Sequence, residues 1–379
     1  MKIPMTPTTD VKTPTTDVKT PTTDVKTPIT DVKTPTTDVK TPTTDVKTPT
    51  TDVKTPTTDV KTNNTIKDQN EKNKIRNLVF SGGGTKCLAY VGVLQYLEEN
   101  QMTQNIRKIV ATSGGSFFAL MFVLGYTCQN MKDIVMRLNF NNLQDITTEN
   151  IFSFFDTYGI DTGKKIEHLL KLFIRKKMNN PMITFLELYK LNNIEFTVTG
   201  TCLNKQRTEY FNYKLTPDMP IYLGVRISCS IPVIYNYVKY NDLIYVDGAI
   251  LDNFPMDYFK NEMQHTLGFC VLSKTDSKEL VNIKTIDQFM LTILISINKK
   301  NIDKLIQQYK KNTIIIECDY EGVNFNLSDQ QKRQVMEKGY NSIKKYYVQK
   351  KKEITNIKIE IDTILNSILE NVLENNLTL

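Results

Sequence analysis

The sequence predicts an α/β fold, in which strands and helices form layers, preceded by a segment that does not fold. Short apolar runs typical of buried strands alternate with amphipathic runs typical of helices between residues 75 and 350. Glycines stand directly after several strand runs, where a chain turns from a strand into a helix. Residues 1–62, in contrast, repeat a polar unit that contains proline. These three observations together indicate a layered α/β domain behind a disordered tail.

The N-terminal segment is a seven-residue repeat, Thr-Pro-Thr-Thr-Asp-Val-Lys, whose Asp-Val-Lys part occurs eight times between Asp10 and Lys61. A seven-residue period is typical of coiled coils, but each unit contains a helix-breaking proline and only one sizeable apolar residue. Such a segment cannot bury enough surface to offset its loss of chain entropy. We therefore expect residues 1–74 to form a disordered tail and linker, which acts either as a spacer or as a docking array for a multivalent partner.

The elements of the α/β domain (residues 75–350) follow in order. Residues 75–100 and 108–126 each have the order of strand, tight turn and helix. A helix is expected at 163–173, and strands are expected at 194–203, 243–247, 265–273 and 312–320. A helix at 327–347 opens with a capping box formed by Ser328 and Gln331. Residues 351–379 are expected to form a separate amphipathic helix, whose apolar residues have helical spacing: Ile357, Ile361, Ile364, Ile368 and Val372.

A glycine-rich loop follows the first strand run. Phe-Ser-Gly-Gly-Gly-Thr-Lys covers residues 80–86. Consecutive glycines allow backbone N–H groups to converge beside a helix N-terminus, where they can hold a phosphate or a developing oxyanion. The loop lacks the ending of a P-loop, and Cys87 stands where a dinucleotide-binding fingerprint has its last glycine. The alternative is a purely structural tight turn.

A turn of small residues surrounds Ser113. A nucleophile elbow holds its serine in a strained strand-to-helix turn, so the neighbouring residues must be small. Ala111, Gly114 and Gly115 meet this condition, with Ala111 in place of the usual first glycine. Ser116 has the wrong spacing. Ser113 is therefore a candidate nucleophile, and the alternative is an ordinary turn with a capping serine.

The serine needs a general base, and the chain has only two histidines. His168 lies within a predicted helix and His265 precedes a strand, so neither has the usual place of a triad histidine. A carboxylate can serve instead when it is held against the serine and partly desolvated. Asp247 ends a strand run before Gly248, whereas Asp252 is assigned to a structural turn. Without a catalytic imidazole, activity is expected to persist at mildly acidic pH.

Three motifs together resemble those of one enzyme family. Gly-Gly-Gly-Thr-Lys, Ala-Thr-Ser-Gly-Gly-Ser and Val-Asp-Gly-Ala occur in this order, and the set is similar to the motifs of the patatin-like phospholipases. The resemblance covers about residues 75–345. It implies a three-layer α/β/α sandwich that cleaves acyl esters of glycerolipids without a metal. It also implies that Ser113 is the nucleophile of a Ser–Asp dyad with Asp247, within an Asp-Gly-Ala motif completed by Gly248 and Ala249.

The resemblance further implies an oxyanion hole and reveals two departures from the family pattern. The oxyanion-hole positions are Gly82, Gly83, Gly84 and, at the family's Arg/Lys position, Lys86. Cys87 replaces the glycine that usually follows this basic residue, and Ala111 replaces the first glycine of the elbow, whereas Gly115 keeps its place. Both departures concern loop geometry, and neither removes a group that does chemistry.

The sequence thus predicts a serine acyl hydrolase of the phospholipase A2 or lysophospholipase type, without a metal or cofactor. Asp247 would take the proton of Ser113 during attack on the ester, backbone N–H groups would hold the oxyanion, and water would cleave the acyl-enzyme. Two other classes stay open. An acyltransferase would pass the acyl group to another acceptor, and a lipid-binding module would bind lipid without releasing fatty acid.

Composition limits the partners and the compartment. The net charge of +7 suits an anionic membrane surface, and because no nucleic-acid-reading motif is present, no specific nucleic acid is expected. The six cysteines are scattered, which argues against a zinc site or disulfide framework and favours a reducing compartment. The sequence shows neither a secretory signal nor a spanning segment. We expect an intracellular, cytoplasmic enzyme that contacts a phospholipid membrane, in part through the basic residues 344–352. Whether it needs a protein activator is left open.

Overall fold

A computed structural model describes residues 74–274, 283, 286–319 and 325–376 of the chain. The seven-residue repeat lies outside the described residues, and so does the rest of the expected tail up to residue 73. The described residues comprise the α/β domain and the helix that continues from it.

The centre of the domain is an eight-stranded sheet. Its strands are β1 (Asn77–Phe80), β2 (Lys108–Ala111), β4 (Glu195–Cys202), β5 (Arg207–Phe211), β7 (Val238–Tyr240), β8 (Leu243–Asp247), β9 (Thr266–Ser273) and β10 (Thr313–Cys318). Their order is β10-β9-β1-β2-β4-β8-β7, and β5 also pairs with β4. The strands β10, β9, β1, β2 and β4 are parallel, whereas β5, β7 and β8 join by antiparallel pairing. A second sheet consists of β3 (Gly159–Asp161) and β6 (Val233–Tyr235).

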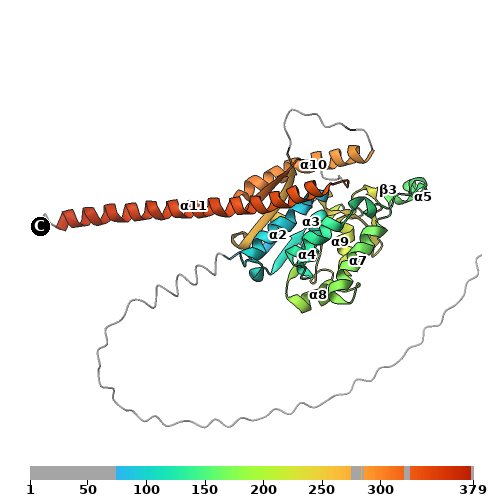
Figure 1. The fold of residues 1–379 in the computed structure, drawn as a ribbon, viewed down its shortest axis with the longest axis horizontal. Helices are drawn as coiled ribbons and strands as arrows, with labels where there is room; N and C mark the ends of the chain where they lie inside the picture. The colour runs from blue at the N-terminus through green and yellow to red at the C-terminus, as the bar shows by residue number, and fades with distance from the viewer. Residues whose placement is uncertain (1–73, 275–282, 284–285, 320–324, 377–379) are drawn as a thin grey trace, which may run out of the picture. The chain divides into compact units, whose positions relative to one another are not determined.

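The helices surround this sheet (Figure 1). The α-helices are α2 (Ala89–Glu99), α3 (Gly114–Val123), α4 (Cys128–Arg137), α5 (Thr148–Phe152), α6 (Phe154–Thr157), α7 (Lys164–Met178), α8 (Phe185–Asn192), α9 (Ile221–Ser228), α10 (Ile286–Gln308) and α11 (Asp329–Asn376). Short 3-10 helices include η1 (Gly84–Leu88), η4 (Gly248–Ile250) and η5 (Met256–Phe259). None of the helices in the described ranges is long and apolar enough to span a bilayer.

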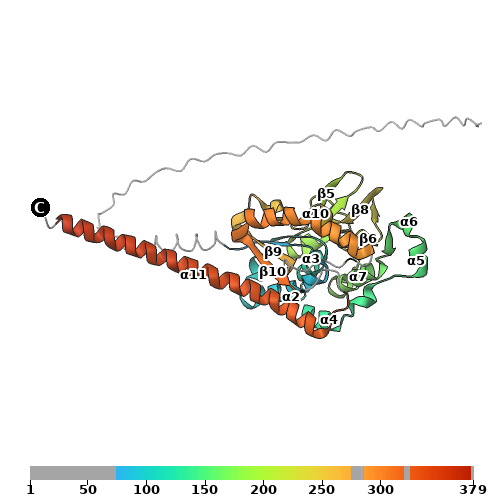
Figure 2. The same ribbon diagram turned by 90° about the horizontal axis from the view of Figure 1, so that it is seen from above.

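Two apolar cores lie on opposite faces of the sheet, because side chains alternate along each strand. Leu78 and Phe80 of β1 belong to the larger core, which also takes in side chains of α2, α3, α4, α9 and α11. Val79 points to the smaller core with Phe254 and with Ile302 of α10. Figure 2 shows α10 on one side of β9 and β10, with α2 and α11 on the other. The predicted three-layer α/β/α sandwich is confirmed.

The C-terminal helix differs from the expectation. It begins where the capping box predicts, since the amide of Gln331 donates to Ser328 Oγ at 3.2 Å and the amide of Ser328 donates to Gln331 Oε1 at 2.9 Å. It then continues without a break to Asn376, so the helices expected at 327–347 and from 351 onward are one element. No glycine or proline occurs between residues 340 and 376 to end it. The expected boundary at residues 350 and 351 therefore falls inside a helix.

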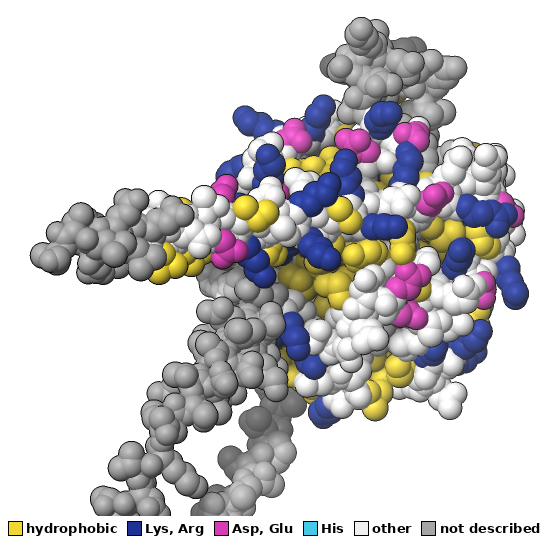
Figure 3. Space-filling view, turned by 60° about the vertical axis from the view of Figure 1, so that its left-hand side comes forward, with side chains coloured by type: hydrophobic (Ala, Val, Ile, Leu, Met, Phe, Trp, Pro, Cys, Tyr) yellow, Lys and Arg dark blue, Asp and Glu magenta, His cyan; other side chains and the backbone are white. Residues whose placement is uncertain are grey.

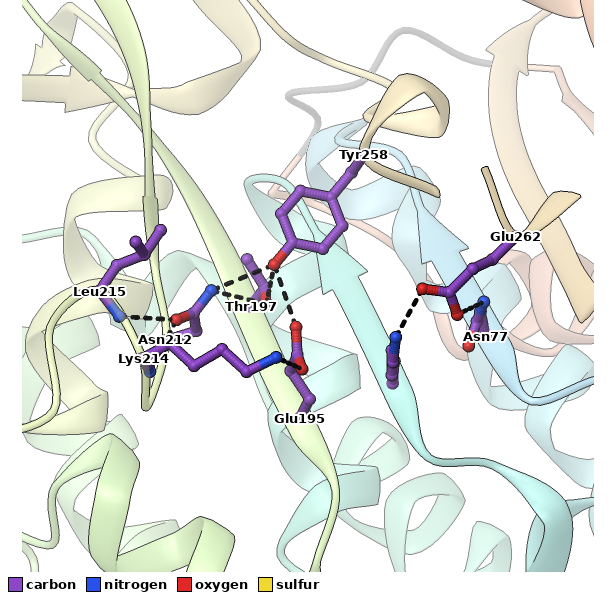
Figure 4. A network of polar contacts seen from close by, with 9 residues as sticks. Asn77, Glu195, Thr197, Asn212, Lys214, Leu215, Tyr258 and Glu262 are labelled. Atoms are coloured by element: carbon purple, nitrogen blue, oxygen red, sulfur yellow. Dashed lines mark hydrogen bonds and ion pairs between the residues drawn. The ribbon is translucent and has the colours of Figure 1, made fainter. Parts of the chain in front are cut away.

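Polar side chains occupy the end of the sheet at which the parallel strands begin (Figure 4). Asn77, at the start of β1, donates to Glu262 at 3.1 Å. Glu195, at the start of β4, accepts hydrogen bonds from Lys214 at 2.8 Å and from the Tyr258 hydroxyl at 3.1 Å. Each carboxylate is thus satisfied by neighbouring donors. This network fixes the end of the sheet opposite the candidate site.

Candidate active site

The two candidate loops follow neighbouring parallel strands, β1 and β2. Because parallel strands end at the same edge of a sheet, the loops meet there. They pack so closely that a methyl group added at Gly82 would lie 2.9 Å from Cβ of Ser113. One added at Gly114 would lie 2.7 Å from the carbonyl oxygen of Gly84. The glycines are therefore needed for the contact between the loops.

Ser113 forms a strained elbow between β2 and α3. Its backbone has φ 51° and ψ −133°, a conformation that residues other than glycine rarely adopt. A methyl group at Gly115 would lie 2.5 Å from the carbonyl oxygen of Ser81, so a larger residue does not fit there. Ala111 is the last residue of β2 and pairs with β1 and β4 in an extended conformation open to any residue. This explains why the first glycine of the usual motif is not required.

The Ser113 hydroxyl donates a hydrogen bond of 2.7 Å to Oδ2 of Asp247. Asp247 ends β8, beside β4, and its Oδ1 accepts a hydrogen bond of 2.8 Å from the amide of Ala249. Gly248 allows this turn, because a methyl group there would lie 2.1 Å from Oγ1 of Thr199. Ser113 is 4% exposed and Asp247 2%. The distance is that of a nucleophile and its general base.

Burial raises the pKa of Asp247 from 3.8 to about 7. The hydrogen bonds from Ser113 and Ala249 and the positive charge of Arg226 oppose this rise. Desolvation exceeds these effects, so the carboxylate is a stronger base than an aspartate in water. The sequence predicted both contributions, but their balance depends on how completely the sheet and helices bury the group.

The glycine-rich loop offers a narrower set of donors than the sequence implied. The amide of Gly82 is already bonded to the carbonyl oxygen of Asn253 at 3.0 Å. Within the part of the chain that the structure describes, no group accepts a hydrogen bond from the amide of Gly83 or Gly84. The ammonium of Lys86 donates to Oγ of Ser273 at 2.9 Å, which ties the loop to the end of β9. Gly82 and Lys86 thus have structural contacts, and two amides are left for an oxyanion.

The geometry agrees with a comparison of the sequence with known families, in which residues 78–260 match the patatin-like phospholipases. Residues 78–260 form a patatin-like phospholipase domain. The matched range contains the loop of Gly82, the elbow of Ser113 and the turn of Asp247.

Individual relatives of this patatin-like protein include two viral proteins. It is 27% identical over 286 residues to the uncharacterized protein R571 of Acanthamoeba polyphaga mimivirus, covering 73% of this chain and 95% of the relative. It is 29% identical over 185 residues to the probable lipid hydrolase 463L of invertebrate iridescent virus 6, covering 48% of this chain and 62% of the relative. Among solved structures, VipD of Legionella pneumophila has the same fold, with a TM-score of 0.50 and 18% identity over 72% of this chain and 66% of VipD.

Residues 226–230 support both members of the pair in the patatin-like domain. The amide of Ser113 donates to Oγ of Ser228 at 2.8 Å, and the amide of Asp247 donates to the carbonyl oxygen of Ser230 at 2.9 Å. Arg226 is 3% exposed and donates to Oγ of Ser230. These residues are not among the site residues predicted from the sequence. A usable signal was the arginine within the apolar run Gly-Val-Arg-Ile-Ser, since a buried charge needs dedicated partners.

The turn after Asp247 connects the two loops of the patatin-like domain. The carbonyl oxygen of Asp252 accepts a hydrogen bond of 3.0 Å from the Thr112 hydroxyl, and its carboxylate accepts one of 2.7 Å from Tyr210. The carbonyl oxygen of the next residue, Asn253, accepts a hydrogen bond from the amide of Gly82. Asp252 therefore contributes to a structural turn, as its sequence context predicts.

Neither histidine contacts the Ser113–Asp247 pair. His168 is exposed on α7, beside a surface hollow of about 440 Å³ that Lys164 and Lys165 also line. His265 precedes β9, and its Nδ1 lies 3.1 Å from the carbonyl oxygen of Lys74, at the opposite end of the sheet. In the described ranges, no group of three or more His, Cys, Asp or Glu side chains is arranged to hold a metal ion.

Proposed function

We propose that this patatin-like protein is a serine acyl hydrolase that cleaves fatty acyl esters of phospholipids, of the phospholipase A2 or lysophospholipase type. The observation that carries the proposal is the 2.7 Å hydrogen bond between Ser113 and Asp247. A strained serine, a buried carboxylate with a raised pKa and two neighbouring backbone donors together suit acyl transfer.

In the proposed mechanism, Asp247 accepts the hydroxyl proton while Oγ of Ser113 bonds to the ester carbonyl carbon. The amides of Gly83 and Gly84 hold the resulting oxyanion. When the tetrahedral intermediate collapses, the protonated Asp247 gives its proton to the departing alcohol oxygen, which leaves an acyl-enzyme. Asp247 then takes a proton from water, whose oxygen attacks the acyl carbon. When this second tetrahedral intermediate collapses, Asp247 returns the proton to Oγ of Ser113, and the fatty acid is released.

The proposed substrate class rests on the family and on physical argument. The name of the iridescent virus relative refers to lipid hydrolysis. Ser113 is 4% exposed, and we infer that neighbouring segments open to admit a lipid ester. We further propose that the protein acts on a phospholipid membrane surface, where apolar acyl chains would favour such an opening. A specific nucleic acid plays no part in this proposal.

Fatty acid release from vesicles of mixed phospholipids tests the proposal directly. Ser113→Ala should lower the rate by several orders of magnitude while vesicle binding stays intact, because only the nucleophile is lost. Ser116→Ala is the matched control, since its hydroxyl donates to the Ser113 carbonyl oxygen at 2.6 Å and does not contact Asp247. Substantial activity in Ser113→Ala would refute the assignment. Vesicle binding by the wild type without release of fatty acid would favour a lipid-binding module, and acyl transfer to added lysolipid would favour an acyltransferase.

A further inference from the structure

The C-terminal part of α11 carries a stripe of exposed isoleucines. They stand at alternating intervals of three and four residues and form what we call the isoleucine seam: Ile354, Ile357, Ile361, Ile364 and Ile368. Each side chain of the seam is between 50% and 59% exposed. This spacing fills the a and d positions of successive heptads, which lie on one face of a helix.

The same face is covered in the first part of the helix. Counting back in heptads from the seam leads to the apolar Met336, Ile343 and Tyr347, of which Met336 is 5% and Ile343 0% exposed. The same count gives two exposed basic residues, Lys350 and Arg333. The helix α2 packs against this part of α11, and the ring of its Tyr96 stacks on Tyr347 with 5.8 Å between the ring centroids. The helix α2 ends at Glu99, whereas α11 runs on beyond it (Figures 1 and 2). The seam thus extends a packed face past the end of its intramolecular partner.

The projecting part of α11 lacks the tertiary packing from which helices in proteins gain most of their stability. Residues 351–369 are exposed along their whole length. Isoleucine makes the helix weaker, because its branched Cβ loses rotamer freedom. Figure 3 shows hydrophobic side chains on the projecting part of α11. Both the helical state and the exposed seam call for a partner.

We propose that the isoleucine seam pairs α11 with α11 of a second copy of this chain, in a coiled coil. Alternating three- and four-residue spacing of isoleucine is the pattern by which helices of this kind recognise each other. Glu353 and Lys358 stand at a g position and at the following e position, which face each other between the helices of a parallel pair. Isoleucine at both a and d also allows assemblies larger than a dimer.

Two other occupants fit the seam less well. An anionic bilayer is disfavoured, since residues 353–369 contain three acidic side chains against one lysine: Glu353, Glu360, Asp362 and Lys358. The N-terminal repeat offers one valine in seven residues, which cannot fill both the a and the d positions. A second copy supplies the same apolar stripe and the opposite charge at the matching position.

Pairing would bring at least two catalytic domains to the same surface. Each copy carries the basic residues 344–352 directly before the seam, so an oligomer would present them more than once. This inference does not depend on catalysis, and it holds or fails independently of the proposed hydrolase function.

The mass of the full-length protein in solution tests the proposal. Light scattering behind size exclusion should give twice the mass of one chain or more, and Ile361→Lys with Ile364→Lys should reduce it to one chain, because two charges would enter the core of the coiled coil. The matched control, Asn356→Lys with Thr363→Lys, places the same charges on the opposite face and should keep the wild-type mass.

A milder variant, Ile354→Ser with Ile357→Ser, covers the case in which the lysine variant does not fold, and it should weaken the assembly in the same direction. A wild type that elutes as a single chain at every concentration would overturn the proposal, as would a seam variant of unchanged mass. A monomer that binds neutral phospholipid vesicles through the seam would overturn it in favour of a lipid surface.

Discussion

The hydroxyl of Ser113 and the carboxylate of Asp247 are joined at 2.7 Å although 134 positions separate them in the chain. Strand β4 brings them together, because it lies between β2, which leads into the elbow, and β8, which ends at Asp247. The segment 226–230 then fixes both backbones. In the proposed mechanism, this contact is the path by which the serine proton leaves.

The pH dependence of the hydrolysis rate should follow the titration of the Asp247 carboxylate. With a pKa of about 7 for Asp247, hydrolysis of a soluble ester should rise tenfold per unit below pH 7 and level off above it. This replaces the expectation of activity at mildly acidic pH, because burial leaves Asp247 protonated there. Asp247→Asn should lose several orders of magnitude in rate. Asp252→Asn is the matched control, since this carboxylate bonds to Tyr210 and not to Ser113, and a flat profile for the wild type would contradict the dyad.

The same carboxylate should reduce the stability of the fold at neutral pH. Its folded pKa of about 7 exceeds the ordinary 3.8, so its contribution to stability is fully present below 3.8 and is lost as pH rises through 7. Asp247→Asn should therefore be more stable than the wild type above pH 7, by on the order of 4 kcal/mol at most. Urea unfolding of both proteins at acidic and at alkaline pH measures this gain. A variant that is less stable than the wild type at alkaline pH would show that the charged form is favoured in the fold.

The histidines should be dispensable. A His168→Gln, His265→Gln double variant should keep most of the wild-type rate, because neither ring contacts the Ser113–Asp247 pair. A general base must come within about 3 Å of the serine hydroxyl, directly or through one water. Single-turnover hydrolysis of a chromogenic ester gives the comparison. If the double variant folds but is as inactive as Ser113→Ala, a histidine triad would replace the dyad.

The basic part of α11 should bind anionic membranes. Its lysines are all exposed: Lys344, Lys345, Lys350, Lys351 and Lys352. Replacing them with glutamine should weaken binding to anionic vesicles at low salt, since each lysine near such a surface contributes ~1 kcal/mol. Co-sedimentation measures the loss, and glutamine at the exposed Lys299, Lys300 and Lys304 of α10 provides the control. Equal binding by both variants at low salt would show that these five lysines have no special part in binding the membrane.

Local patterns in the sequence determined the elements and the candidate pair. The run before Gly82 and the run of β10 are apolar over the length of a strand, and Ser328 with Gln331 marks the start of α11. The small residues around Ser113 and the strand that ends at Asp247 indicated the two groups now found in contact. These features depend on neighbours within a few residues, which a sequence displays directly.

The tertiary structure decided what depends on distant segments. It raised the pKa of Asp247, because surrounding elements exclude water from it, and it engaged the amide of Gly82 with Asn253. It joined the buried Arg226 to Ser230, whose carbonyl oxygen accepts from the amide of Asp247. It also packed the first half of α11 against α2 and left the isoleucine seam exposed. Burial and long-range hydrogen bonds arise only when strands far apart in the chain become neighbours in the sheet, and for that reason no local pattern contains them.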